Sequence, residues 1–171
     1  MRNTATTPMK WGNHIRGNTV DESKKQAAID ALNHIMELEL AGVVRYTHYS
    51  LMVYGYNRIP IVSWLKGNAD ESLAHAHKAG ELVTLLGGHP SLKIGALLET
   101  EQHDIGDILR ESLDLETTAL SAYYALLKIV EGNSVLLEEY AREMIVAEEL
   151  HLDEVNKMLR RPGAIEVFAA S

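Results

Sequence analysis

The sequence contains no cysteine, and this absence removes several kinds of chemistry. Without a thiol the chain can form no disulfide, no thiolate zinc site and no cysteine nucleophile. It also lacks a run of about 18 apolar residues, so we expect no membrane-spanning helix. Residues 1–19 have no apolar core of the kind found in signal peptides, which favours a cytoplasmic location.

Positive charge is scarce as well. The 16 lysine and arginine residues are outnumbered by 24 aspartate and glutamate residues, and the net charge is −8. General binding to nucleic acid requires a cationic surface, so nucleic acid is not an expected partner. Residues 1–19 hold Arg2, Lys10 and Arg16 without an acidic residue, a density too low for a DNA-binding tail. We interpret them as an N-terminal extension.

Strand-like alternation is also missing, whereas apolar residues recur every three or four positions. This spacing predicts four helices, at about 19–54, 60–86, 101–130 and 134–159. Thr19 to Glu22 has the pattern of a capping box, and Asn133 or Ser134 can cap the fourth helix. The glycines and proline of residues 87–90 predict a long connection between the second and third helices.

We therefore predict an all-α fold, an antiparallel four-helix bundle spanning residues 20–161. A chain of 171 residues is most simply one domain with a substantial core. Residues 162–171 are expected to form a short C-terminal tail.

Ionisable residues interrupt the apolar stripes of these helices. Glu148 and His151 form a Glu-x-x-His motif within the fourth stripe, Glu39 and Glu116 lie in the first and third, and His75 lies in the second. Such stripes normally pack into a core, where an unpaired charge is costly. A metal ion is a partner that would satisfy both carboxylates and imidazoles.

Helical register predicts that these residues meet. Glu39 and His75 lie about fifteen residues before and after the first turn, and Glu116 and Glu148 lie sixteen residues before and after Gly132. In an antiparallel hairpin, equal distances from the turn place residues at equal height. All four side chains are therefore expected near the middle of the bundle.

The two halves of the chain look like a duplication. Glu39 and Tyr46 are seven residues apart, and so are Glu116 and Tyr123. The Glu-x-x-His of the fourth helix corresponds to a Ser-x-x-His in the second, where Ser72 replaces the glutamate.

A glutamate from each of two helices and a Glu-x-x-His from each of two others form the di-iron carboxylate arrangement of helix bundles. The sequence resembles the ferritin-like superfamily, most closely bacterioferritins and bacterial non-haem ferritins, from about residue 32 to residue 161. The resemblance is carried by Leu38-Glu39 with Tyr46, His75-Ala76, Asp107-Ile108-Leu109-Arg110 with Leu115-Glu116, and Glu148-Glu149-Leu150-His151.

The resemblance implies a function and a set of site residues. It implies oxidation of Fe(II) by O₂ or peroxide at a di-iron centre, for iron storage or detoxification, in a homo-oligomer of at least two subunits. Tyr46 falls on a tyrosine beside that centre and is a candidate catalytic residue. The implied metal ligands are Glu39, His75, Glu116, Glu148 and His151.

Two positions depart from the family pattern. The sixth ligand position is Ser72, and the neighbouring Glu71 is rotated by about 100° around a regular helix. Glu71 lies four residues before His75 and therefore shares a face with it, so Glu71 remains a candidate metal ligand. The methionine that binds haem in bacterioferritins corresponds to Leu73, so we expect no haem.

Two other hypotheses remain open. The bundle can support a di-metal oxidase or a manganese catalase-type enzyme, because carboxylates and imidazoles suit manganese as well as iron. Alternatively, Ser72 marks a degraded centre, and the protein is a non-catalytic module that holds one metal such as zinc.

Overall fold

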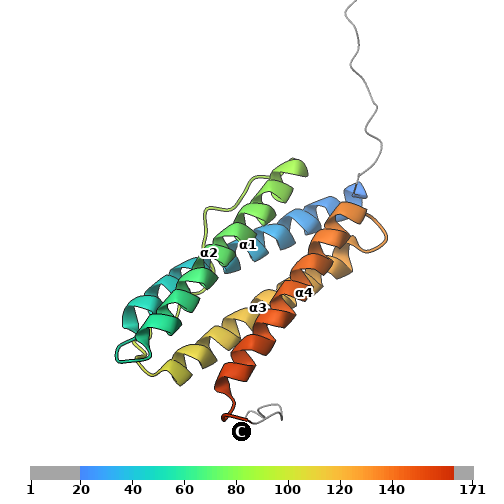
Figure 1. The fold of residues 1–171 in the computed structure, drawn as a ribbon. Coiled ribbons are helices and arrows are strands. Elements are labelled where there is room, and N and C mark those ends of the chain that lie inside the picture. The colour runs from blue at the N-terminus through green and yellow to red at the C-terminus, as the bar shows by residue number, and fades with distance from the viewer. Residues whose placement is uncertain (1–19, 164–171) are drawn as a thin grey trace, which may run out of the picture.

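The structure, a computed structural model, describes residues 20–163 of the chain. It contains α1 (Glu22–Met52), α2 (Arg58–Leu85), α3 (Ile105–Val130) and α4 (Val135–Leu159), and no strand within residues 20–163 (Figure 1). The predicted all-α four-helix fold is confirmed. None of these helices is long and apolar enough to cross a membrane.

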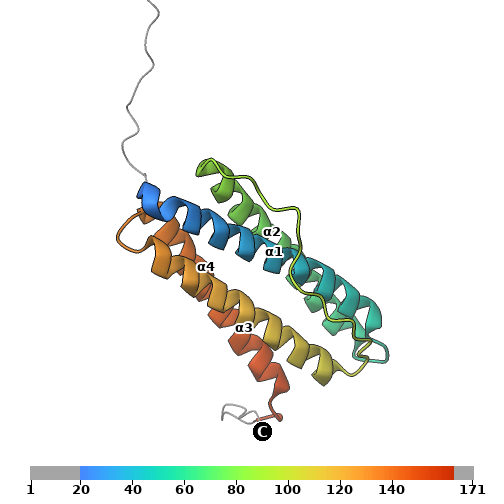
Figure 2. The same cartoon turned by 180° about the vertical axis from the view of Figure 1, so that it is seen from behind.

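The helices form two hairpins that lie against each other. α1 contacts both α2 and α3, and α3 contacts α4. Residues 86–104 form the predicted long connection and run along the hairpin of α1 and α2 back to the end where α3 begins (Figure 2). This connection is fastened to α1, because Gly95 N donates to Glu37 O at 2.7 Å and Ser91 N donates to Asn33 Oδ1 at 2.8 Å.

Capping side chains set the starts of α1, α3 and α4. Asp21 is the N-cap of α1 and accepts a hydrogen bond from Ser23 N at 3.1 Å, whereas the predicted cap, Thr19, lies outside the described residues. Ser134, one of the two residues that the sequence offered as this cap, caps α4 and accepts from Leu137 N. Side-chain oxygens satisfy backbone N–H groups that have no partner in the first turn of a helix.

The predicted start of the third helix near residue 101 is wrong. α3 begins at Ile105, because the Asp104 side chain accepts from Asp107 N at 3.1 Å and ends the extended connection there. The periodic apolar pattern does not register this boundary, since the cap is a single polar side chain and not part of the apolar spacing.

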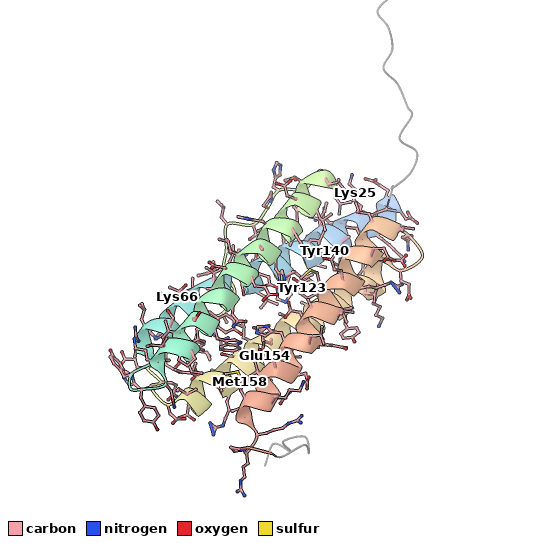
Figure 3. All side chains as sticks on the ribbon, viewed as in Figure 1. Lys25, Lys66, Tyr123, Tyr140, Glu154 and Met158 are labelled. Carbon is pink, nitrogen blue, oxygen red and sulfur yellow. The ribbon has the colours of Figure 1, made fainter. Side chains whose placement is uncertain are left out.

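The interior consists of two apolar clusters with a polar layer between them. One cluster includes Leu32, Ile35 and Leu126, and the other includes Tyr46 and Leu65. Along α1, α2 and α3, the ionisable side chains of the stripes lie between the residues of the two clusters. Side chains from all four helices fill this interior (Figure 3).

Two glycines allow the close approach of α1 and α2 to be tested. A Cβ atom at Gly42 would lie 2.7 Å from Ser72 Oγ and 3.2 Å from Ser72 Cβ, whereas a Cβ at Gly67 would meet nothing within 4 Å. We predict that Gly67→Ala raises the free energy of unfolding by about 0.5–1 kcal/mol through helix propensity. Gly42→Ala should lower it by about 1 kcal/mol, because overpacking outweighs the same propensity gain. Urea unfolding followed by circular dichroism measures both, and equal stabilisation by the two changes would contradict the close contact.

Candidate metal centre

Three buried glutamates form the centre of the polar layer. Glu39 on α1, Glu116 on α3 and Glu148 on α4 are 5%, 5% and 3% exposed. Each lies on the apolar stripe of its helix, so the packing that buries the stripe also buries the carboxylate. Within residues 20–163, no lysine or arginine forms an ion pair with any of the three. Compensation of their charge must come from another source.

The donor atoms form two groups that share one carboxylate. In the first, His75 Nδ1 lies 3.5 Å from Glu39 Oε1 and 3.2 Å from Glu148 Oε1. In the second, which joins Glu116, Glu148 and His151, His151 Nδ1 lies 3.5 Å from Glu116 Oε2. Within each group the three donor atoms lie within 4.8 Å of one another. Five of the six candidate ligands are thus brought together, and metal binding by them stays a prediction.

Glu71, the sixth candidate, lies apart from both groups. Its side chain is 55% exposed, and its Oε1 is 3.9 Å from His75 Nε2, the ring nitrogen that faces away from Glu39 and Glu148. Ser72 is buried and packs closely against Gly42 on α1. The structure therefore places Glu71 on the outer side of the His75 ring.

Two tyrosines tie the hairpins together across this layer. Tyr46 on α1 donates a hydrogen bond to Glu116 Oε1 on α3, and Tyr123 on α3 donates to Glu39 Oε1 on α1 at 2.7 Å. Burial, reinforced by the charge of Glu116, raises the pKa of Tyr46 well above its usual value. Burial, with the charge of Glu39, raises that of Tyr123 as well. Both phenols therefore keep their protons and act as donors. From the sequence, only Tyr46 is a candidate catalytic residue, and the repeated seven-residue spacing marks Tyr123 as its counterpart on the third helix.

Protons balance part of the negative charge in the metal-free protein. Burial opposes protonation of His75, but hydrogen bonds to Glu148 and Glu39 overcome it and raise the pKa of the imidazole to about 10. Burial also raises the pKa of Glu148, and the neighbouring Glu116 and Glu39 add to the effect. The pKa of His151 is raised by Glu116 in spite of burial. Positive charge is thus strongly favoured in this layer.

This donor set fits a pair of divalent cations. Three carboxylates and two imidazoles suit iron, manganese or zinc, and a divalent ion would replace the protons that the layer otherwise holds. Glu148, which belongs to both groups, would be the carboxylate that holds both ions. The buried negative charge, without lysine or arginine partners in the described chain, is the observation that supports the fit.

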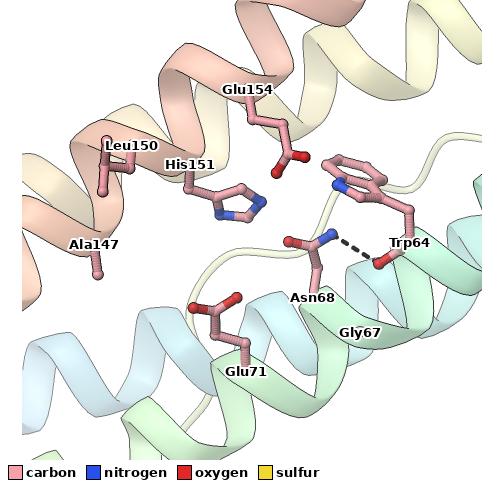
Figure 4. Close-up of a pocket in the computed structure, with 8 residues that line it drawn as sticks. All are labelled: Trp64, Gly67, Asn68, Glu71, Ala147, Leu150, His151 and Glu154. Carbon is pink, nitrogen blue, oxygen red and sulfur yellow. Dashed lines mark hydrogen bonds between the residues drawn. The ribbon is translucent and has the colours of Figure 1, made fainter.

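A pocket of about 580 Å³ lies between α2 and α4 and reaches the edge of this layer. Figure 4 shows the His151 ring and the carboxylates of Glu71 and Glu154 directed into it. Asn68 and Trp64 line the opposite wall, where Asn68 Nδ2 donates to Trp64 O at 2.8 Å. The pocket connects the surface with the ring of His151.

The raised pKa of His75 predicts a pH dependence of stability. Its pKa is about 10 in the folded protein and 6.5 without interactions, so the folded state binds more protons between these values. The free energy of unfolding of the metal-free protein should therefore fall as pH rises from about 6.5 to 10, by at most about 1.4 kcal/mol per pH unit for this group.

Thermal unfolding of the metal-free protein between about pH 6.5 and 10 measures this dependence. Comparison of the wild type with His75→Gln isolates the contribution of His75. The variant should lose stability less steeply, and His77→Gln, at an exposed position on α2, should behave like the wild type. If stability falls with pH equally in the wild type and in His75→Gln, Glu39 and Glu148 do not stabilise the protonated form of His75.

Comparisons with known proteins agree with this architecture. A ferritin-like, diiron-carboxylate protein from Bacillus anthracis superposes with a TM-score of 0.77 at 20% identity, over 82% of this chain and 100% of that chain. Desulfovibrio desulfuricans bacterioferritin, whose structure describes a diiron site in different catalytic states, gives 0.71 at 26% identity, over 81% of each chain. A Dps protein from Vibrio cholerae O1 gives 0.74 at 14% identity, over 87% of this chain and 100% of that chain.

No curated protein matches the sequence. The profile of the ferritin-like domain matches residues 29–163, which include all five grouped donors and both tyrosines. The chain therefore belongs to the ferritin-like domain family.

Proposed function

We propose that this protein binds two Fe(II) ions at the centre of the bundle and oxidises them to Fe(III), with O₂ or peroxide as the oxidant. The observation that carries this proposal is the pair of buried three-donor groups that share Glu148. The diiron site of the Desulfovibrio desulfuricans protein, at 26% identity over 81% of each chain, supports it.

The residues of the chain have distinct parts in this reaction. Glu148 would hold two ions side by side, and three carboxylates would offset three of their four positive charges. Tyr46 and Tyr123 would keep Glu116 and Glu39 in orientation through their hydrogen bonds. Two Fe(II) ions held there would supply two electrons to the oxidant. Because Ser72 contributes no carboxylate, small molecules would complete the coordination of the ions.

A second function on the same bundle is a di-metal oxidase or a manganese catalase-type reaction. The pocket at His151 favours it, since about 580 Å³ can admit a small substrate as well as an ion. Evolution of O₂ from peroxide by the manganese-loaded protein would identify this reaction. Binding of one ion such as zinc, without oxidation of Fe(II), would instead identify a non-catalytic metal-binding protein.

We also propose that the chain forms a homo-oligomer. The connection between α2 and α3 exposes Leu92, Ile94, Leu97 and Leu98, and Val44 beside it on α1 is exposed as well. An apolar surface of this kind is typical of contacts between subunits. Iron storage would follow if the subunits enclose a shell, and detoxification requires only the oxidation. Sedimentation of the native protein gives the number of subunits.

The dinuclear proposal predicts both stoichiometry and rate. Anaerobic titration of the metal-free protein should show two Fe(II) bound per chain, and exposure to O₂ should produce Fe(III) absorbance rapidly. Glu148→Gln should slow this oxidation by about 100-fold or more, because it removes the only carboxylate common to both donor groups.

Glu143→Gln is the matched control. Glu143 lies on the exposed face of α4 and pairs with Lys78, so its loss should leave stoichiometry and rate unchanged. Oxidation no faster than in buffer, or a Glu148→Gln variant as fast as the wild type, would rule the proposal out.

A further inference from the structure

We infer that Glu71 positions the imidazole of His75 from outside the metal centre, and that the donor group with His75 therefore binds its ion more tightly than the group with His151. This inference rests on the dinuclear centre proposed above. It gives Glu71 a part different from that of the sixth ligand expected from the sequence.

The two histidines present the same nitrogen to the centre. His75 Nδ1 faces Glu39 and Glu148, and His151 Nδ1 faces Glu116. A metal ion held at Nδ1 leaves the single proton of a neutral imidazole on Nε2. In both residues this N–H then points away from the centre, and its acceptor decides how firmly the ring is held.

His75 has such an acceptor within reach. Glu71 Oε1 lies 3.9 Å from His75 Nε2, an ion-pair distance that a small rotation of the half-exposed Glu71 side chain shortens to a hydrogen bond. Glu71 is one helical turn before His75, so the two side chains share a face of α2. A carboxylate that accepts from the outer N–H of a ligating imidazole fixes the orientation of the ring and raises its basicity.

The same geometry argues against Glu71 as a ligand of this ion. The carboxylates of Glu39 and Glu148 lie on the Nδ1 side of the His75 ring, and Glu71 lies on the Nε2 side. A side chain that contacts Nε2 is separated by the ring itself from an ion at Nδ1. Figure 4 shows Glu71 at the wall of the pocket that His151 and Glu154 also line.

In the described part of the chain, the outer nitrogen of His151 has no such acceptor, although the charge of Glu71 contributes to the raised pKa of this imidazole. The residue one turn before it is Ala147, where α2 has Glu71. His151 Nε2 is buried and has no hydrogen-bond partner within residues 20–163. Glu154 lines the same pocket but forms no ion pair with His151 in the described chain. A buried N–H without an acceptor disfavours metal binding at Nδ1 of the same ring.

Co(II) binding tests the inference without any oxidation step. Calorimetry and visible absorbance of the metal-free full-length protein should show two ions with unequal affinities. Glu71→Ala should weaken the tighter ion by about 10- to 100-fold, the usual effect of losing an outer acceptor, and Glu71→Gln should retain part of the affinity because its amide oxygen still accepts. Asp70→Asn, an exposed change on the same helix, is the control.

A double-mutant cycle with His75→Ala separates a positioning residue from a ligand. If Glu71 acts only through His75, adding Glu71→Ala to His75→Ala should change Co(II) affinity no further. A further loss of affinity in that background would make Glu71 a ligand and overturn the inference. Unchanged Co(II) binding in His75→Ala alone would instead overturn the dinuclear centre.

A variant expected to bind Co(II) more tightly at the donor group with His151 tests the predicted difference in affinity between the two donor groups. Ala147→Glu supplies the missing acceptor one turn before His151, in a position that borders the pocket and has room for a longer side chain. It should tighten the weaker Co(II) ion and bring the two affinities closer. No change in the weaker ion, with helicity intact by circular dichroism, would contradict the account of the asymmetry.

Discussion

The structure depends on compensating three carboxylates buried in the middle of the bundle. Burial of ionised carboxylates without cations is strongly unfavourable, and the described chain offers Glu39, Glu116 and Glu148 no lysine or arginine partner. The imidazoles of His75 and His151 supply the balance through raised pKa values when no metal is bound. The apolar clusters on either side keep water away and so strengthen this requirement. Positive charge is therefore stabilised at this buried site. Protons on the two histidines offset the carboxylate charge only in part, whereas a pair of divalent ions would offset all of it.

The two hairpins place a carboxylate and a histidine near the buried layer in similar but unequal ways. On α4, Glu148 lies three residues before His151 and faces the centre, and the position before it is Ala147. On α2 the arrangement is reversed, because Ser72 holds the inner position and Glu71 the outer one. Each of these two helices thus has one carboxylate near its histidine, inside the layer on α4 and outside it on α2. The crossed hydrogen bonds of the tyrosines preserve the symmetry that the glutamates of these helices have lost.

Much of this arrangement could be predicted from the sequence, because helical periodicity places a residue on a face and equal distances from a turn place residues at one height. The predicted meeting of Glu39 with His75 rested on these two rules, and both are backbone geometry. The start of α3 was missed because it depends on a single capping contact of Asp104. Helical rotation indicated that Glu71 lies at the edge of the stripe. Its place beside Nε2 of His75 could not be predicted, since it depends on which ring nitrogen of His75 faces Glu39 and Glu148. Side-chain rotation about χ1 and χ2 leaves no periodic trace in a sequence.

The most direct test of the central claim is a crystal structure of the Mn(II)- or Fe(II)-loaded protein with anomalous diffraction recorded at the absorption edge of the metal. Two anomalous peaks, about 3.5–4 Å apart, are predicted on either side of Glu148, one bound by His75 Nδ1 and the other by His151 Nδ1. Glu71 should lie against His75 Nε2 without contacting either peak. A single peak would contradict the account. So would peaks at surface carboxylates with none in the buried layer.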